Sequence, residues 1–206
     1  MEWPEKIIIG IGEEWKKGPD AESEKRLREA YEALYQQVQG KDYWVSTTVT
    51  DGLIYETAFD PKRITAPCGN DHWFQCSKAC TKDIWEEGEV PEGICPHCGA
   101  PLTANTVQAD PYIEEGYLPQ WEAYKKWQAT ILNRDLLLLE LGVGLAYPTV
   151  IRWPFERIAM LSKKARLLRV HETLSQLPEG LERGQRIKEN SVDWVLDTLR
   201  ETSENK

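Results

Sequence analysis

The chain has 206 residues, a length that suits one main hydrophobic core. Its 25 basic and 34 acidic residues give a net charge of -9, which opposes binding to the phosphates of nucleic acids. The longest apolar stretch, residues 136–151, contains Glu140 and is interrupted by glycine and proline, so it is too short and too polar to span a membrane. We therefore expect no nucleic-acid and no membrane partner. The start of the chain shows no secretory pattern, which predicts a cytoplasmic location.

Strands and helices alternate through the first third of the chain. An apolar, β-branched run predicts the first strand, and apolar residues at three- and four-residue steps predict a long helix after it. The expected elements are a strand at Lys6–Gly10, a helix from its N-cap Asp20 to Val38, a strand at Tyr43–Val49, a helical segment at Leu53–Ala58 and a brief strand at Arg63–Ala66.

The same alternation returns in the second half of the chain. The expected elements are a helix at Leu118–Leu132, a strand at Leu136–Leu141, a helix at Pro148–Met160 kinked by Pro154, a strand at Ala165–Val170, a short strand at Arg186–Lys188 and a helix at Ser191–Leu199 capped by Ser191. Strands that are apolar enough to be covered on both faces predict an α/β fold with a doubly wound parallel sheet.

Four cysteines stand in two close pairs between these two series of elements. Cys76 and Cys80 are followed, after fourteen residues, by Cys95 and Cys98, a spacing typical of the two knuckles of a zinc ribbon. Four thiolates complete a tetrahedral zinc site, so the metal would be structural. Two disulfides or four free thiols are the alternatives, and a reducing cytoplasm disfavours the disulfides. The sequence thus predicts a zinc ribbon inserted at residues 69–104.

Glycines and polar residues follow three of the predicted strands. Gly10-Ile11-Gly12, the segment 47–51 and Gly142-Val143-Gly144 each come at the carboxyl end of a strand. In a doubly wound sheet, ligands bind beyond the carboxyl ends of the strands. We therefore expect these three segments to form the walls of one cleft.

The order of these features resembles the sirtuin (silent information regulator) family. A Gly-rich turn, the segment Thr47-Thr48-Val49-Thr50-Asp51, Gly69 before a four-cysteine ribbon and a later strand ending in Gly142-Val143-Gly144 follow one another as in that family. The segments 74–78 (FQCSK), 139–144 (LELGVG) and 152–156 (RWPFE) look like its bacterial, macrodomain-linked branch (class M). The studied members of that branch resemble protein ADP-ribosyltransferases.

The resemblance implies one sirtuin-like domain over residues 1–206, with a Rossmann-like sheet, the ribbon as a small module and NAD in the cleft between them. It also implies a protein partner or protein substrate, with a macrodomain or a lipoylated carrier protein as candidates. The residues that it places at the cofactor are Gly10, Gly12, Thr47, Thr48, Asp51, Gly142, Val143, Gly144 and His171.

The chain departs from the family pattern where the chemistry should lie. Glu13 and Glu14 follow the Gly-rich turn, and their carboxylates would repel a pyrophosphate. Val49 replaces the asparagine that holds a ribose and an ordered water in the family, and it offers no side-chain hydrogen bond. Cys68 stands where sirtuins have a catalytic histidine and the macrodomain-linked branch has glutamine.

Cys68 and Asp51 are the candidate catalytic residues that remain. A cysteine acts as a nucleophile when its thiolate is stabilised, and His72 comes four residues later. The alternative is a buried cysteine that only fills space. Glu140 lies in an apolar strand, where a buried charge needs a partner, so we expect it to form structural hydrogen bonds or to lie at the rim of the cleft.

Three functions follow as hypotheses. The first is a sirtuin-like zinc-binding protein that has lost catalysis and keeps a cleft for NAD or ADP-ribose, or a partner-binding role. The second is an active NAD-dependent protein ADP-ribosyltransferase or deacylase with a rebuilt active site. The third is an interaction module that docks through the ribbon. Val49 and Cys68 favour the first and third, and Asp51 with Gly142-Val143-Gly144 favours the first over the third.

Overall fold

Six parallel strands form the main sheet of the computed structural model, which describes residues 3–131 and 133–204. The strand order is β3-β2-β1-β7-β8-β9, formed by Ile64–Thr65, Asp42–Thr47, Lys6–Ile11, Leu136–Leu141, Ala165–Val170 and Gly184–Ile187. Every neighbouring pair in this sheet is parallel. The chain thus winds outward in both directions from β1, as in a Rossmann sheet, and the predicted fold class is confirmed.

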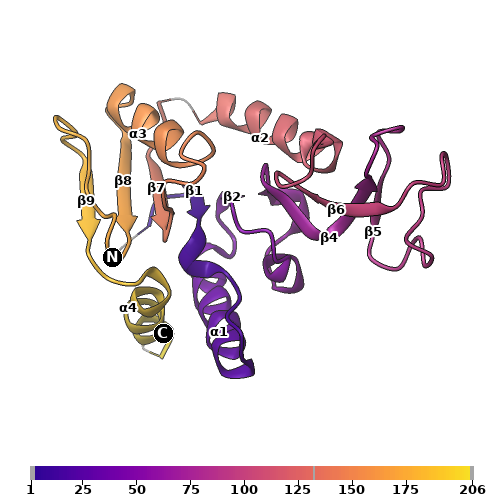
Figure 1. The fold of residues 1–206 in the computed structure, drawn as a ribbon. Helices are drawn as coiled ribbons and strands as arrows, with labels where there is room; N and C mark the ends of the chain where they lie inside the picture. The colour runs from indigo at the N-terminus through magenta and orange to yellow at the C-terminus, as the bar shows by residue number, and fades with distance from the viewer. Residues whose placement is uncertain (1–2, 132, 205–206) are drawn as a thin grey trace.

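Helices cover both faces of the main sheet (Figure 1). Helices α1 (Ala21–Val38) and α4 (Ser191–Glu204) lie on one face, and α2 (Leu118–Thr130) and α3 (Arg152–Leu161) lie on the other. Alternate residues of each strand enter one core or the other, because side chains of a strand point to opposite faces. Both faces of the central strands are therefore buried, which accounts for unbroken apolar runs such as the one in β7.

A second, antiparallel sheet stands to one side of the first (Figure 1). Its order is β5-β4-β6, formed by Ile84–Glu86, Gly69–Cys76 and Leu102–Thr106, and the four paired cysteines lie at the end of β4 and in the loops between these strands. Short 3-10 helices occupy the connections: η1 (Glu13–Trp15), η2 (Leu53–Glu56), η3 (Pro61–Arg63) and η4 (Glu114–Gly116). That residues 1–206 are one domain with an insertion at 69–104 stays a prediction.

Helix ends show where local sequence rules succeed and fail. Asp20 caps α1 as predicted, with its carboxylate accepting the Ser23 N–H at 2.8 Å. The predicted kink at Pro154 is wrong, because α3 begins at Arg152 and places this proline in the first turn, where its missing N–H breaks no hydrogen bond. Leu132, the predicted end of α2, lies outside the described residues.

The cap of the last helix was also predicted wrongly. The side-chain oxygen of Asn190, and not that of Ser191, accepts the N–H groups of Val192 and Asp193 at 3.0 and 3.3 Å. The Ser191 hydroxyl instead accepts the Trp15 indole N–H at 3.0 Å, which joins α4 to the turn after β1. In the part of the chain that is described, no helix has the length and apolar surface that crossing a membrane requires.

Candidate functional site

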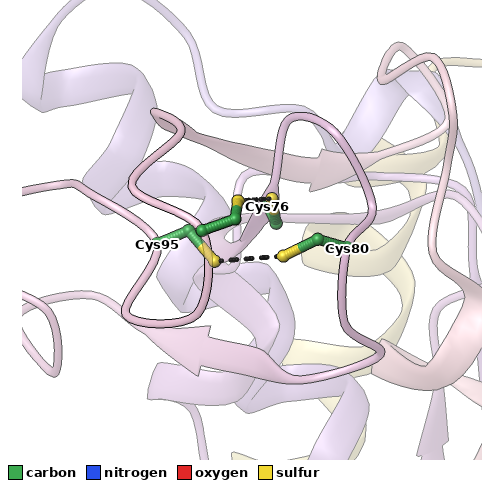
Figure 2. A group of neighbouring side chains, drawn as sticks. Cys76, Cys80 and Cys95 are labelled. Carbon is green, nitrogen blue, oxygen red and sulfur yellow. Dashed lines mark hydrogen bonds between the residues drawn. The ribbon is translucent and has the colours of Figure 1, made fainter.

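The four paired cysteines meet at one point of the ribbon (Figure 2). Cys76 ends β4, Cys80 follows it, and Cys95 and Cys98 come from the loop before β6. The sulfurs of Cys76 and Cys98 are 3.6 Å apart, those of Cys80 and Cys95 are 3.5 Å apart, and all four lie within 4.8 Å of one another. Four sulfurs at about 2.3 Å from a central ion would be about 3.8 Å apart, so the set fits a tetrahedral metal ion.

Left-handed residues shape the loop around each cysteine pair. Ala79 has φ 46° and Gly99 has φ 72°, and their N–H groups donate to the carbonyl groups of Cys76 and Cys95 at 2.9 Å. Backbone N–H groups, first that of Cys80, lower the pKa of the Cys76 thiol to about 6. The hydrogen bond with Cys98 raises the pKa of Cys80, so this thiol must lose its proton when a metal ion binds.

His97 lies between two of these cysteines in the sequence but contacts a different group. Its Nε2 lies 2.7 Å from a carboxylate oxygen of Asp83, and its side chain is 53% exposed. The cysteines alone therefore make up the cluster that could hold a metal ion among the described residues.

The second part of the site is the carboxyl edge of the main sheet, where β1 and β7 lie side by side and the chain reverses its direction of winding. Gly12 is required here by close approach, since a Cβ on it would lie 2.4 Å from the Val143 Cα. Gly10 is required by packing, since a Cβ on it would lie 2.3 Å from the Ile151 side chain. Both glycines therefore have structural reasons to be present that do not involve a nucleotide.

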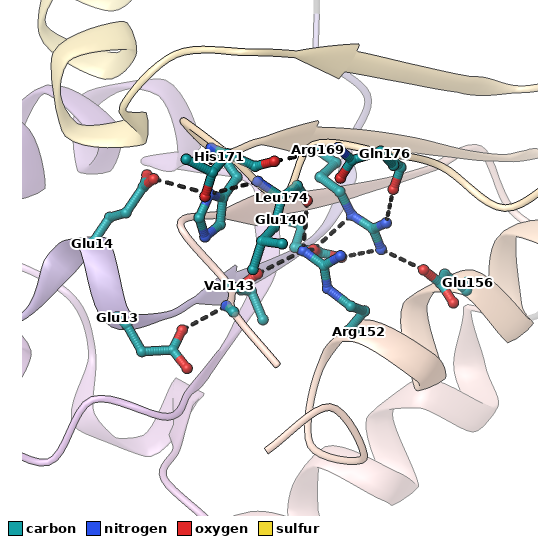
Figure 3. A network of polar contacts seen from close by, with 12 residues as sticks. Glu13, Glu14, Glu140, Val143, Arg152, Glu156, Arg169, His171, Leu174 and Gln176 are labelled. Carbon is teal, nitrogen blue, oxygen red and sulfur yellow. Dashed lines mark hydrogen bonds and ion pairs between the residues drawn. The ribbon is translucent and has the colours of Figure 1, made fainter. Parts of the chain in front are cut away.

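Glu13 and Glu14, both shown in Figure 3, use their carboxylates to accept backbone N–H groups after β7, after β8 and at the start of α4. Glu13 accepts the Gly144 N–H at 2.5 Å. Glu14 accepts the Ser191 N–H at 2.7 Å and the Glu172 N–H at 2.9 Å, and its side chain is only 11% exposed. Ser191 begins α4, so the positive end of the helix dipole also stabilises the Glu14 charge.

His171 lies beside Glu14 at the end of β8 (Figure 3). Its Nδ1 is 3.2 Å from a Glu14 oxygen, yet the same nitrogen accepts the N–H groups of Thr173 and Leu174, both at 3.1 Å. Because two donors converge on Nδ1, we take this nitrogen as unprotonated and the contact with Glu14 as proximity without an ion pair. The ring thus holds the turn after β8.

The segment after β2 is also held by its own backbone. The Thr47 hydroxyl accepts the Val49 N–H at 3.0 Å. The Asp51 carboxylate accepts the N–H groups of Lys17 at 2.6 Å and Leu53 at 3.1 Å. Thr48 differs, because its buried hydroxyl has no hydrogen-bond partner within residues 3–131 and 133–204. Among the predicted cofactor residues, Thr48 thus has a hydroxyl that is buried and has no partner in the described part of the chain.

Thr48 faces a cleft of about 370 Å³ between the main sheet and the end of the ribbon. This carboxyl-edge cleft falls within the usual size range of small-molecule sites. A hydrogen bond of 2.9 Å from the Gln108 amide to the Tyr147 hydroxyl joins its two sides. The lining residues are Glu13, Lys16, Thr48, Val49, Thr50, Asp71, Thr106, Val107, Gln108 and Tyr147.

Cys68 is 1% exposed, just before β4. Burial, with a smaller effect of Glu13, raises the pKa of its thiol to about 12, so the thiolate that nucleophilic attack requires is scarce near neutral pH. His72 does not activate it, because the His72 Nδ1 lies 2.5 Å from a Glu87 carboxylate oxygen. These contacts suit a cysteine that fills space, and its catalytic role stays an untested prediction.

A buried ion network supports the strand ends from beneath, and the sequence reasoning found only one of its members, Glu140. Glu140 is fully buried and contacts Arg169 Nε at 2.7 Å and Arg152 Nη2 at 3.2 Å (Figure 3). Arg169 also binds Glu156 at 2.7 Å. Burial raises the pKa of Glu140, and the two guanidinium groups oppose that rise.

Arg152 connects this network to the loops after β7 and β8. Its guanidinium donates to the carbonyl oxygens of Val143 at 2.6 Å and Leu174 at 2.8 Å, which fixes the loops after β7 and β8. The segments 139–144 and 152–156, which look like the macrodomain-linked branch, thus meet in space. Arg169 could have been found from sequence, because a charged residue inside an apolar strand requires an opposite charge nearby.

No family model matches the chain. Among curated proteins, it is 27% identical over 157 residues to a probable bifunctional ADP-ribose hydrolase/ADP-ribosyltransferase of Fusarium oxysporum f. sp. cubense, covering 64% of this chain and 26% of the relative. It is 22% identical over 194 residues to a protein ADP-ribosyltransferase of Staphylococcus aureus, covering 85% of this chain and 62% of the relative. The chain therefore spans about a quarter of the first relative and under two thirds of the second.

Two solved structures resemble the whole chain. One is a complex of a mutant Sir2 homologue with 2′-O-acetyl ADP-ribose, with a TM-score of 0.58 and 10% identity over 97% of this chain and 92% of the other. The second is a Sir2 homologue–NAD complex, with a TM-score of 0.58 and 11% identity over 97% and 90%. The chain thus has a sirtuin-like Rossmann fold that carries a four-cysteine cluster able to hold a metal ion.

Proposed function

We propose that this chain is a sirtuin-like zinc-binding protein that does not turn over NAD and binds ADP-ribose-containing ligands weakly. The observation that carries the proposal is the position of the Glu13 and Glu14 carboxylates, which accept the N–H groups of Gly144, Glu172 and Ser191. A phosphate at this edge of a Rossmann sheet would need free N–H donors and no nearby negative charge. Here the donors are already used, and the charge is present.

The metal that we propose is zinc, held by Cys76, Cys80, Cys95 and Cys98. Four sulfur ligands suit a soft tetrahedral ion and leave no open position for an activated water, so zinc would hold the ribbon together and take no part in a reaction. The role that we propose for the metal is therefore structural.

The groups that would carry the chemistry are missing or buried. Val49 offers no side-chain hydrogen bond to a ribose, and the raised pKa of Cys68 makes it a poor replacement for a general base. Thr48 lines the carboxyl-edge cleft and has a buried hydroxyl without a partner among the described residues, which supports residual binding of NAD or ADP-ribose. The loss of catalysis and the retention of a cleft are therefore proposed together.

A second candidate is an active NAD-dependent protein ADP-ribosyltransferase or deacylase, because both curated relatives have ADP-ribosyltransferase in their names. Its partners would be a protein substrate and, from the resemblance to the macrodomain-linked branch, a macrodomain or a lipoylated carrier protein. A cytoplasmic location belongs to either candidate. For the second, another chain or Cys68 would have to supply the missing chemistry.

Calorimetric titration with ADP-ribose and NAD tests the first candidate. We expect weak binding to the unchanged chain and binding at least about tenfold tighter for the double variant Glu13→Ala, Glu14→Ser, which frees three N–H donors and removes two charges. The matched control is Glu92→Ala, Glu179→Ser, which removes two exposed carboxylates elsewhere. Equal binding by both double variants would contradict the proposal.

An assay for nicotinamide release separates the two candidates. The unchanged chain should release none from NAD, with or without acylated peptides or a lipoylated carrier protein. Release that disappears in Cys68→Ala would establish the second candidate and make Cys68 a substituted catalytic residue.

A further inference from the structure

A second cavity lies between the ribbon and the neighbouring 3-10 helices, and it is distinct from the carboxyl-edge cleft. It measures about 630 Å³ and is bounded by strands β4 and β5 and the 3-10 helices η2 and η4. None of its lining residues lines the carboxyl-edge cleft. Its volume falls within the range of cavities that enclose ligand groups. We call it the ribbon cavity.

Two aromatic rings form one wall of the ribbon cavity. The rings of Tyr55 and Trp73 have centroids 5.5 Å apart and planes inclined at 54°, and both side chains are half-buried. The faces of such rings carry negative electrostatic potential, so they attract a cation that lies above them. The guanidinium group of arginine suits them best, since it is planar and stacks on an aromatic face.

The rim of the cavity is acidic. Glu56, Glu86, Glu87 and Glu115 line it, and no lysine or arginine does so among the described residues. Arg28, His72 and Lys82 pair with Glu56, Glu87 and Glu115 respectively. Exposed pairs of this kind are weak and can exchange for an incoming cation. Glu86 lies in β5 and is exposed.

A buried acceptor lies behind one wall of the cavity. The Asn105 side-chain oxygen is fully buried and lacks a hydrogen-bond partner in the described part of the chain. It lies 2.2 Å from the point that a Cβ on Gly116 would occupy, and Gly116 lines the cavity. Asn105 itself does not line the cavity, so a bound cation would depend on the aromatic wall and the acidic rim.

We infer that the ribbon cavity binds an arginine side chain of a protein partner. The guanidinium would stack on Tyr55 and Trp73 and pair with Glu86, which offers both the apolar and the charged contact that arginine makes at protein interfaces. The net charge of -9 would speed the approach of a basic partner. This inference does not depend on whether the carboxyl-edge cleft binds a nucleotide.

NMR titration of the zinc-loaded full chain tests it, with N-acetyl-arginine methylamide as the probe. The indole N–H signal of Trp73, assigned with Trp73→Phe, should shift and saturate. The uncharged isostere N-acetyl-citrulline methylamide should bind more weakly by about threefold or more, since it keeps the shape and loses the charge. Equal affinity for the two probes, no shift at all, or shifts confined to the carboxyl-edge cleft would overturn the inference.

Single substitutions test whether the arginine probe binds in the ribbon cavity. Glu86→Gln and Trp73→Leu should each weaken binding of the arginine probe by about two- to fivefold, the usual contribution of one exposed charge or ring. Glu92→Gln removes a carboxylate from the same ribbon outside the cavity and should change nothing. The metal content of Trp73→Leu shows whether its ribbon is folded. If Glu86→Gln and Glu92→Gln bind alike, the cavity is not the site.

Discussion

The ribbon and the carboxyl edge of the main sheet lie on two sides of one cleft, and they keep the sirtuin-like pattern to different degrees. In the ribbon, four sulfurs lie within 4.8 Å of one another, at the separations that a tetrahedral ion requires. At the sheet edge, the glycines remain but the N–H donors bind the chain's own carboxylates. In the ribbon the sulfurs are free to hold a metal ion, whereas at the sheet edge the N–H groups of Gly144, Glu172 and Ser191 already have acceptors.

The difference shows that two kinds of constraint act on the same fold. A side chain at Gly10 or Gly12 would place its Cβ only 2.3 or 2.4 Å from a neighbouring atom. Packing therefore requires both glycines, whether or not a nucleotide binds. Glu13 and Glu14 meet no such steric requirement, and their carboxylates accept the N–H groups of Gly144, Glu172 and Ser191. A Gly-rich turn at a strand end is therefore weak evidence for a nucleotide site unless the N–H groups around it are free.

The largest effect is expected from removing the metal ligands. Cys76→Ser should abolish zinc binding and unfold the ribbon while the main sheet stays folded, because the free energy of metal binding in such modules is about 10–16 kcal/mol and is used for folding. Elemental analysis and NMR spectra of the ribbon amides measure the two results. Cys68→Ser, which alters the cysteine outside the cluster, should keep the zinc.

If Cys76→Ser unfolds the main sheet as well, the ribbon and the main sheet do not unfold independently. That result would contradict the contrast drawn between the two regions. A natively purified chain without zinc would contradict the metal assignment itself.

The second-largest effect is expected on the free energy of unfolding when Glu140 is replaced. Glu140→Ala should lower the free energy of unfolding by about 3–5 kcal/mol, because it leaves Arg169 and Arg152 buried without their shared partner. Urea unfolding monitored by tryptophan fluorescence measures the change. Glu182→Ala, at an exposed position, is the control and should have almost no effect. A loss below about 1 kcal/mol would mean that the network contributes little to holding the strand ends.

The fold could be predicted from the sequence because its signals are local and repeated. The apolar run of β7 and the Asp20 cap of α1 each depend on a few neighbouring residues, and both were predicted correctly. The cap of α4 was missed because Asn190 and Ser191 are adjacent and both can cap a helix. Only the Trp15 indole, distant in sequence, shows that the Ser191 hydroxyl is used elsewhere.

The site could be predicted only in part, because its contacts are distant in sequence. The four clustered cysteines could be predicted from their spacing, because they lie close together in the sequence of a short ribbon. The pairing of Glu14 with Ser191 spans 177 residues, so no periodicity or motif could reveal it. The sequence suggested that Glu13 and Glu14 repel a phosphate. It could not show that they also accept the N–H groups of Gly144, Glu172 and Ser191.

Replacing Glu14 should sharpen the comparison, with an intermediate effect. Glu14→Ala should lower the free energy of unfolding by about 1–2 kcal/mol, since it removes two hydrogen bonds and a charge at the start of α4. Glu13→Ala, which loses one hydrogen bond from an exposed side chain, should cost less. Urea unfolding compares the two variants.

Adding phosphate tests whether the Glu14 carboxylate occupies a site that could bind an anion. At tens of millimolar phosphate, Glu14→Ala should recover part of its lost stability, because the freed N–H groups bind the anion and binding to the native state stabilises it. The unchanged chain should gain less. If phosphate stabilises both equally, the Glu14 carboxylate does not occupy an anion site.

The smallest effect concerns His72, on the ribbon side of the comparison. Its hydrogen bond with Glu87 raises the pKa of the imidazole above its ordinary value of about 6.5. A raised pKa means that the pair stabilises the fold fully below pH 6.5 or so, and that this stabilisation is lost as the pH rises through the folded-state pKa. The His72 side chain is 51% exposed, so the contribution should be under about 1 kcal/mol. An NMR titration of the His72 ring should give a pKa that falls in Glu87→Gln and is unchanged in Glu92→Gln. A pKa that does not respond to Glu87→Gln would show that the pair is absent in solution.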